Sequence, residues 1–390
     1  MAWNWQQPDW PAFTWDPALM GKAEEQFLLG VGLVAGSMKH LPGTDQEQVT
    51  IEAISTEAVT TSEIEGEVLD RASVQSSLRR QLGLNFDQRK VRPQEHGIAK
   101  MMVSLYRSFA EPLSDEMLFA WHAMLMNGRG DLKIVGTYRT GSEPMQVVSG
   151  AVYEPKIHFE APPSSIVRKE MKRFVRWFNE TAPSGKSPLP ALTRAGVAHL
   201  YFVSIHPFED GNGRIGRAIA EKALAQCVGQ PTLTALAATI LQKRKAYYEE
   251  LERANKRNRI STWLRWFGGI GLEAQGRTTA LVEFLIQKAR LLDRLKGSLN
   301  QRQEKALMRM LREGPDGFTG GLSAGNYQTI TGASPATATR DLVGLVAMGA
   351  LVKSGERRHA RYWVAIPVAP QESVVIADEG SIRRMRKITS

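Results

Sequence analysis

The twelve residues from His206 to Arg217, H-P-F-E-D-G-N-G-R-I-G-R, constrain this chain more than any other feature. They follow the apolar run 197–205 and combine a titratable ring, two carboxylates, three glycines and two arginines. A glycine-rich turn that opens a helix directs backbone N–H groups and the positive end of the helix dipole toward an anion. The stretch therefore predicts a helix, a phosphate-binding turn and a second helix.

The side chains of this stretch suit attack on a nucleotide phosphate. Gly211 and Gly213 permit a close backbone approach and unusual backbone angles. Arg214 and Arg217 project from one face of the following helix, where both guanidinium groups can grip phosphate oxygens. Asp210 is a hard oxygen ligand of the kind that Mg²⁺ takes beside phosphates.

His206 titrates near neutrality and can accept a proton. In this order the residues match without a gap the signature H-x-F-x-D/E-G-N-G-R-x-x-R, and the chain resembles Fic-domain proteins. The usual activity of that family is transfer of AMP from ATP to a protein hydroxyl group. The resemblance implies that His206 is the general base and that Asp210 holds Mg²⁺ between the α- and β-phosphates. It also implies a phosphate cradle at 211–213 with a side-chain contact from Asn212, while Phe208 anchors the loop.

Two more segments resemble parts of the same family. The segment 136–150 has the glycine bounds and apolar centre of a β-hairpin, and it resembles the flap that binds a target chain by strand addition. Tyr248 and Asn255 lie seven residues apart and resemble the adenine-side helix. An ordinary hairpin, a packed tyrosine and an exposed asparagine are the alternatives. The flap residues are Met145, Gln146, Val147 and Val148.

An upstream stretch, A-V-T-T-S-E-I-E-G-E, adds regulation. Thr61, Glu65 and Gly66 fit the family's inhibitory pattern S/T-x-x-x-E-G/N, and the spacing of the preceding residues places Glu65 on one helical face. The resemblance implies that Glu65 pairs with Arg217 and takes the space of a γ-phosphate, so that ATP binds unproductively. The chain thus resembles the class whose inhibitory helix lies N-terminal to the core. A surface glutamate in an acidic stretch is the alternative.

The inhibitory reading predicts the behaviour of one variant. Breaking a buried ion pair costs about 3–5 kcal/mol, so Glu65→Gly is expected to be less stable and yet more active. In some Fic proteins the same glutamate also helps to remove AMP, and the sequence leaves that activity open.

The expected fold is mainly α: a Fic-type helical core with a small β-hairpin flap, followed by a C-terminal winged helix-turn-helix domain. Trp3, Trp5, Trp10 and Trp15 alternate with prolines, which indicates an extended strap that docks its rings on the protein. The expected parts are an N-terminal helical region with this strap (1–92), the catalytic core (93–272), a linking helix (273–299), the winged helix (300–366) and a basic, solvated tail (367–390).

The winged-helix assignment rests on three predicted helices between 301 and 349 and on strands at 350–354 and 359–365. Ser334 is the expected N-cap of the third helix and Pro335 its first residue. Residues 301–365 hold nine basic and five acidic side chains, a modest balance for DNA binding, so protein docking or dimerisation remains an alternative. The candidate DNA contacts are Thr337, Thr339, Arg340, Arg357, Arg358 and Arg361.

Composition agrees with a globular enzyme. One cysteine in 390 residues offers no disulfide framework, and the run 27–38 is too short to span a bilayer. No secretory signal is visible, so we expect a cytoplasmic enzyme without a membrane partner. ATP is the expected substrate and Mg²⁺ the expected cofactor, with an unidentified target protein, self-modification and a homodimer as further expectations. A DNA-binding regulator and a Fic enzyme with another nucleotide donor are the alternatives.

Overall fold

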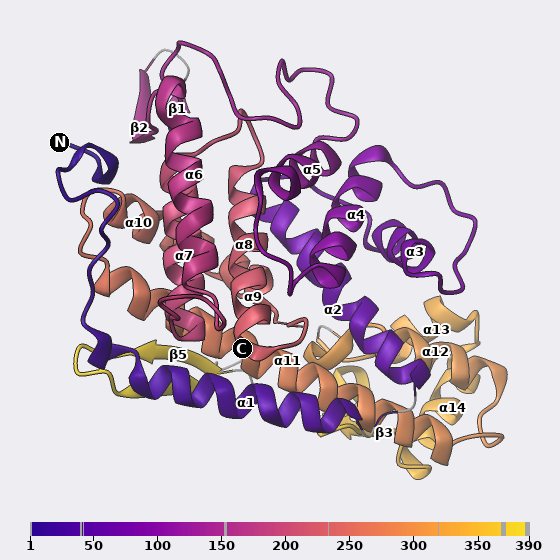
Figure 1. Cartoon of the computed structure of the whole chain (residues 1–390). Helices are drawn as coiled ribbons and strands as arrows, with labels where there is room; N and C mark the ends of the chain where they lie inside the picture. The colour runs from indigo at the N-terminus through magenta and orange to yellow at the C-terminus, as the bar shows by residue number, and fades with distance from the viewer. Residues whose placement is uncertain are drawn as a thin grey trace. The chain divides into compact units, whose positions relative to one another are not determined.

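A computed structural model shows a mainly helical chain with three two-stranded antiparallel sheets (Figure 1). Two compact units are formed: the first by Met1–Leu33, Thr50–Thr278 and Glu372–Ser390, the second by Val34–Val49 and Thr279–Gln371. The structure describes residues 2–39, 41, 43–151, 154–232, 234–318, 320–367 and 372–386.

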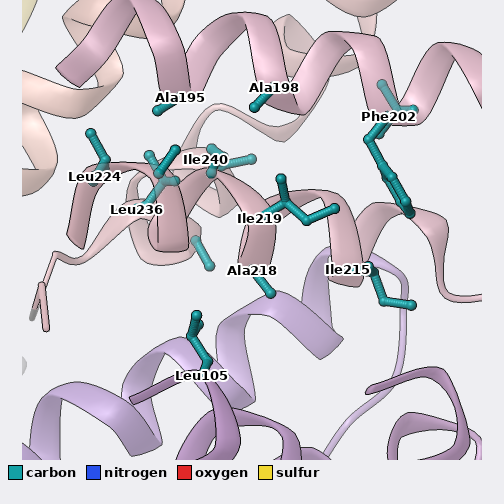
Figure 2. Close-up of a cluster of buried hydrophobic side chains, with 14 of the residues drawn as sticks. Leu105, Ala195, Ala198, Phe202, Ile215, Ala218, Ile219, Leu224, Leu236 and Ile240 are labelled. Carbon is teal, nitrogen blue, oxygen red and sulfur yellow. The ribbon is translucent and has the colours of Figure 1, made fainter. Parts of the chain in front are cut away.

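Helices α7 (Ala191–Ile205) and α8 (Asn212–Val228) form the centre of the first unit. Every residue of α7 is buried, as expected for a helix that is apolar on all sides. Ala198 of α7 lies on the side of α8 that carries Ile219 and Ala195 lies nearer Leu224, and these small side chains let the two helices pack closely (Figure 2). The helix, turn and helix predicted around the motif are therefore present.

The other helices of the chain up to residue 294 surround or extend this pair. Three of them, α1, α2 and α11, contribute residues to both compact units. Their bounds are α1 (Gly21–Lys39), α2 (Gly43–Ile64), α3 (Arg71–Leu82), α4 (Pro93–Arg107), α5 (Asp115–Leu125), α6 (Ser164–Glu180), α9 (Leu236–Gln242), α10 (Arg244–Ala254) and α11 (Ser261–Arg294).

The predicted linking helix does not begin at residue 273. Helix α11 runs without a break from Ser261 to Arg294, across the expected end of the catalytic core. Its glycines do not interrupt it, because Gly268 and Gly271 provide room for the side chains of Met20 and Leu192. Close packing, which the local sequence does not reveal, keeps these glycines in a helix.

The predicted basic tail forms a strand pair where the structure describes it, while its basic run 383–386 is exposed as expected. Strands β5 (Glu372–Ile376) and β6 (Ile382–Arg386) form an antiparallel pair in the first unit. Val374 and Ile376 are each only 4% exposed, since they alternate on one face of β5 and pack on the core. Lys387, the last residue of the basic run, lies outside the described residues.

The flap hairpin exists, but it lies further along the chain than predicted. Strand β1 (Gln146–Ala151) pairs with β2 (Glu154–Glu160). The stretch before it is not a strand, because its polar groups bind the core instead. Tyr138 donates to Asp115 at 2.6 Å, and the backbone N–H of Arg139 donates to the Pro207 carbonyl at 2.9 Å.

In the second unit, α12 (Gln301–Leu311), α13 (Ala324–Thr331) and α14 (Pro335–Ala347) precede the antiparallel strands β3 (Leu351–Ser354) and β4 (Arg361–Val364). The Ser334 hydroxyl accepts from the backbone N–H of Thr337, so the predicted N-cap is confirmed. A polar link joins the helices, because Asp341 of α14 accepts from Tyr327 of α13 at 3.0 Å.

Within the described residues, no helix combines the length and the apolar character that crossing a bilayer requires.

Candidate active site

The motif loop is fixed at both ends by its backbone. His206 ends α7 in the left-handed region, with a φ of 51°, and Gly211 begins α8 with a φ of 79°. Such a φ is uncommon for a residue with a side chain, and surrounding contacts must hold it. Arg139 supplies one of them, because its Nε donates to the His206 carbonyl at 2.8 Å. The loop geometry is therefore fixed by a residue from outside the motif.

Phe208 and Asn212 hold the loop from within. The Phe208 ring is fully buried and stacks on His122 with a centroid distance of 4.2 Å. The Asn212 amide accepts from the Phe208 N–H at 3.0 Å and donates to the Phe208 carbonyl at 2.9 Å. Asn212 thus stabilises the loop, and this corrects the expectation that its side chain reaches toward the phosphates.

His206 is set up as a neutral base. Its Nδ1 lies 3.3 Å from the Val203 carbonyl, which can only accept, so Nδ1 carries the hydrogen and Nε2 is left as the acceptor. Burial lowers the pKa of His206 to about 4. The imidazole is therefore uncharged at neutral pH and can take a proton.

Asp210 is paired with an arginine that the sequence analysis missed. Its Oδ2 lies 2.8 Å from Arg129 Nη1, and its Oδ1 lies 3.6 Å from Arg214 Nη2. Burial alone would raise the pKa of Asp210, but the Gly211 N–H and the two arginines outweigh it and lower the pKa below its ordinary value. Arg129 lies 81 residues before Asp210, and no local pattern connects the two.

Thr61 and Glu65 both contact Arg217, and the Glu65 contact is the pairing that the resemblance implied. Thr61 accepts from Arg217 Nε at 2.7 Å through its hydroxyl, and Glu65 Oε1 accepts from Arg217 Nη2 at 2.8 Å. Arg217 is 3% exposed, whereas the Glu65 side chain keeps 30% of its exposure. Burial would raise the pKa of Glu65, yet Arg217 lowers it, so the carboxylate is charged.

Glycines on both sides make this contact possible. A Cβ at Gly213 would lie 2.3 Å from Glu65 Oε1, so a larger residue there would displace the carboxylate. Gly66 has a φ of 87°, which lets the chain turn away directly after the glutamate. The alternative of a purely surface-exposed glutamate is therefore wrong.

The other motif arginine also meets a glutamate. Arg214 Nη1 lies 2.7 Å from Glu67 Oε2, a pairing that the sequence analysis missed because Glu67 was read as part of an acidic stretch. One nitrogen of each arginine, Arg214 Nε and Arg217 Nη1, is buried without a hydrogen-bond partner in the described part of the chain. Such buried donors are costly unless a ligand satisfies them.

An open cavity of about 580 Å³ joins most of the predicted residues. Its walls come from the inhibitory segment, the hairpin, the motif loop and α10, which are far apart in sequence. Thr61, Gly66, Phe208, Arg214 and Arg217 do not line it. The predicted residues on its wall are Glu65, Met145, Gln146, Val147, Val148, His206, Asp210, Gly211, Asn212, Gly213, Tyr248 and Asn255.

Tyr248 and Asn255 share the cavity wall but differ in exposure. The Tyr248 side chain is 38% exposed, and its hydroxyl is 3.4 Å from Glu65 Oε2. Asn255 is 5% exposed, and its Oδ1 accepts from the Ser204 hydroxyl at 3.0 Å. The alternative of an exposed asparagine is therefore wrong.

A polar triad on the hairpin side of the cavity was not anticipated. A β-bulge leaves His158 unpaired in the register of β2, and its ring bridges Ser149 at 2.6 Å and Glu252 of α10 at 2.7 Å. Bulges re-aim side chains in this way. The bridge ties the hairpin to α10.

The residues fit a nucleotide and a divalent cation. The N-terminus of α8 and the unsatisfied nitrogens of the two arginines suit phosphate oxygens. In the described part of the chain no cluster of three or more His, Cys, Asp or Glu side chains could hold a metal alone. Asp210 therefore suits a cation whose other ligands are phosphates and water, as Mg²⁺ accepts.

Comparison with known proteins gives the class of this site. Residues 112–224 match the Fic/DOC family model, so the chain contains a Fic/DOC domain. Residues 3–84 match a second family model, described only as a domain of unknown function, DUF4172.

Individual relatives follow from the same comparison. The protein adenylyltransferase Fic of Drosophila ananassae and that of Drosophila melanogaster are each 36% identical over 86 residues, which is 22% of this chain. That match spans only 16% of each relative. A Fic family protein from Desulfovibrio desulfuricans G20 is structurally similar with a TM-score of 0.50 at 19% identity, over 91% of this chain and 98% of that one, and shares the fold.

Proposed function

We propose that this chain is a self-inhibited protein adenylyltransferase, which transfers AMP from ATP to a Ser, Thr or Tyr hydroxyl group of a target protein. The observation that carries the proposal is the cavity in which neutral His206, the N-terminus of α8 and Glu65 meet. The name of the partial relatives supports AMP as the transferred group.

In the proposed reaction the target hydroxyl oxygen attacks the α-phosphorus of ATP. A new P–O bond forms, the bond from the α-phosphorus to the bridging oxygen breaks, and pyrophosphate leaves. His206 Nε2 takes the hydroxyl proton, since Nδ1 already holds its own hydrogen. The backbone at 211–213 and the guanidinium groups of Arg214 and Arg217 stabilise the negative charge on the phosphate oxygens.

Asp210 is the residue that would hold Mg²⁺, which supplies charge neutralisation at the phosphates. In the free enzyme Arg129 neutralises the charge of Asp210, because its Nη1 lies 2.8 Å from the carboxylate. Binding of a cation there requires Arg129 to release the carboxylate.

Inhibition follows from the contacts of Arg217. While Glu65 accepts from Nη2, that nitrogen is not available to a γ-phosphate, and the carboxylate repels the phosphate. ATP then binds with its α-phosphate out of line with the target hydroxyl. Removal of Glu65 frees the guanidinium group and gives access to the productive pose.

The test uses Glu65→Gly enzyme with α-labelled ATP and α-labelled UTP in parallel, and Glu65→Gly/His206→Ala as the control. We expect label from ATP on protein, reduced about 10²–10⁴-fold in the double variant. Label from UTP alone would show that the transferred nucleotide is UMP and not AMP. Loss of label from pre-labelled protein would assign AMP removal to the same site, and no label from any donor would refute nucleotidyl transfer.

A second proposal concerns the second unit, whose helices α12–α14 and strands β3–β4 follow the order of a winged helix-turn-helix. Arg340 on α14 and Arg357 before β4 are exposed, which supports DNA contact. Thr339 donates to its own helix, at the Pro335 carbonyl, and the Arg358 side chain lies outside the described part. Sequence-specific binding to a duplex at physiological salt supports this proposal, and weak binding that salt abolishes contradicts it.

A further inference from the structure

Residues 2–10 contact the wall of the cavity from outside the motif. Asn4 is fully buried, and its side chain donates to the Ser204 hydroxyl at 2.9 Å. Ser204 in turn donates to Asn255, and the backbone N–H of Asn4 donates to the Asn255 carbonyl at 2.7 Å. Asn4 therefore holds a residue of the cavity wall to the last turn of α7, two residues before His206.

The two tryptophans beside Asn4 hold the hairpin. The Trp5 indole N–H donates to the Glu160 carbonyl, the last residue of β2, at 2.7 Å. The Trp3 ring packs edge-on against Phe159 with a centroid distance of 5.4 Å, and Phe159 lines the cavity. One short segment thus contacts both α10's end and the base of the hairpin.

A third tryptophan of the same segment binds elsewhere. The Trp10 indole N–H donates to Glu170 of α6 at 2.9 Å, and its ring packs edge-on against Tyr201. None of Trp10, Glu170 and Tyr201 is on the cavity wall. Trp5 and Trp10 therefore each donate one indole hydrogen bond to a different part of the first unit, Trp5 to a backbone carbonyl of the hairpin and Trp10 to a carboxylate of α6.

We propose that Trp3, Asn4 and Trp5 are positioning residues of the transfer cavity: they set the base of the hairpin and Asn255 against the catalytic loop. The role in target docking rests on the proposed adenylyl transfer. The proposal gives a positioning role to the beginning of the DUF4172 match, residues 3–84, which also contains Glu65. The same region then both assembles and inhibits the site.

The physical reason lies in the shape of the hairpin. Two antiparallel strands alone are marginally stable, and Val148 and Ile157 are about half exposed, at 50% and 44%. Its position must come from contacts at its base and side, which are the strap and the His158 bridge. A small displacement of a positioning element costs up to about 10²-fold in rate.

The test compares Trp5→Phe with Trp10→Phe, both in the Glu65→Gly background. Each substitution keeps a ring and removes one indole hydrogen bond, but only Trp5 contacts the hairpin. Hydrogen exchange of the amides in 146–160 is measured together with kcat and the KM for ATP in self-labelling. A third variant, Asn4→Ala, probes the Asn255 side.

We expect exchange of the hairpin amides to be about twofold to tenfold faster in Trp5→Phe and unchanged in Trp10→Phe. Trp5→Phe should lower kcat with little change in KM, whereas Asn4→Ala should raise the KM for ATP. Equal exchange in the two tryptophan variants would overturn the inference even if AMP transfer is intact. Transfer that fails in every variant, with exchange still different between them, would overturn the proposed function but not the positioning of the hairpin.

Discussion

Helix α2 meets α8 at two places with opposite electrostatics. At the C-terminal end of α2, Thr61 and Glu65 meet the cation Arg217. Two turns earlier, Glu57 of α2 meets another carboxyl group, Glu221 of α8, and each is only 7% exposed. Opposite charges meet at the Glu65 end of this contact, and two acidic groups meet at the Glu57 end.

The contact between Glu57 and Glu221 is stabilised by neutral hydrogen-bond donors. Glu57 accepts from the Ala237 N–H at the start of α9 through both oxygens, at 3.0 and 2.8 Å. Glu221 accepts from the hydroxyl groups of Thr232 and Thr234. Burial raises the pKa of Glu221 to about 7, and burial followed by the charge of Glu221 raises that of Glu57. The two raised pKa values mean that this pair does not carry two full negative charges at neutral pH.

The difference shows how an inhibitory helix can be firmly placed and still be removable. The ion pair at the Glu65 end opens to the cavity, where a phosphate can compete for Arg217. The Glu57 end is closed to phosphate, and it responds to pH instead.

The largest expected effect is at Arg217, which takes part in both inhibition and transfer. Arg217→Met removes the partner of Glu65 and also one phosphate donor. In the Glu65→Gly background we expect AMP transfer to fall by about 10²–10³-fold, as for loss of one transition-state donor. Arg217→Lys keeps the charge but lacks the planar guanidinium group. Its rate of AMP transfer should lie between those of the Glu65→Gly protein with Arg217 and the Arg217→Met variant. A Met variant that transfers AMP at the Glu65→Gly rate would contradict the assigned role.

The next effect is at Glu221 and concerns the stability of the fold. Burial raises the pKa of Glu221 in the folded state to about 7, above its ordinary value of 4.5. The stabilising effect of the protonated group is therefore fully present below pH 4.5 and is lost as pH rises through 7. Between pH 5 and 8 the parent should lose about 1–3 kcal/mol through this group. Thermal unfolding of Glu221→Gln should lack this loss. An identical pH dependence of unfolding in the parent and in Glu221→Gln would contradict the raised pKa of Glu221.

The smallest effect is at Glu67, whose contact with Arg214 is 2.7 Å and whose side chain is 32% exposed. Glu67→Gln should lower the KM for ATP about twofold to fivefold, the size expected for an ion pair with one partly exposed partner. Glu63→Gln is the matched control, because Glu63 is exposed in the same segment. Equal KM values for the two variants would show that Glu67 does not restrain Arg214.

The sequence predicted well those features in which neighbouring residues act together. The helix, loop and helix around His206 and the N-cap at Ser334 depend on local backbone chemistry, and the structure has both. The hairpin was placed too early, because Tyr138 and Arg139 have apolar and turn-like neighbours but bind remote core groups.

Long-range partners could not be found in the same way. Arg129 and Glu67 bind motif side chains that lie 81 and 147 residues away, and no periodicity marks such pairs. His158 becomes part of the cavity only through a β-bulge. The β5–β6 pair was read as a tail since its basic residues hide the alternating, buried Val374 and Ile376.

The central claim is that Glu65 restrains a site that is otherwise assembled. The most direct measurement is the initial rate of AMP transfer from α-labelled ATP by the parent, Glu65→Gly and Glu63→Gly. Because Glu65 is partly exposed, the lost charge-assisted hydrogen bond should lower the free energy of unfolding by about 1.5–3 kcal/mol, less than for a fully buried pair. We predict a rate at least about tenfold above the parent for Glu65→Gly and a parental rate for Glu63→Gly. Equal rates in all three proteins would contradict the account.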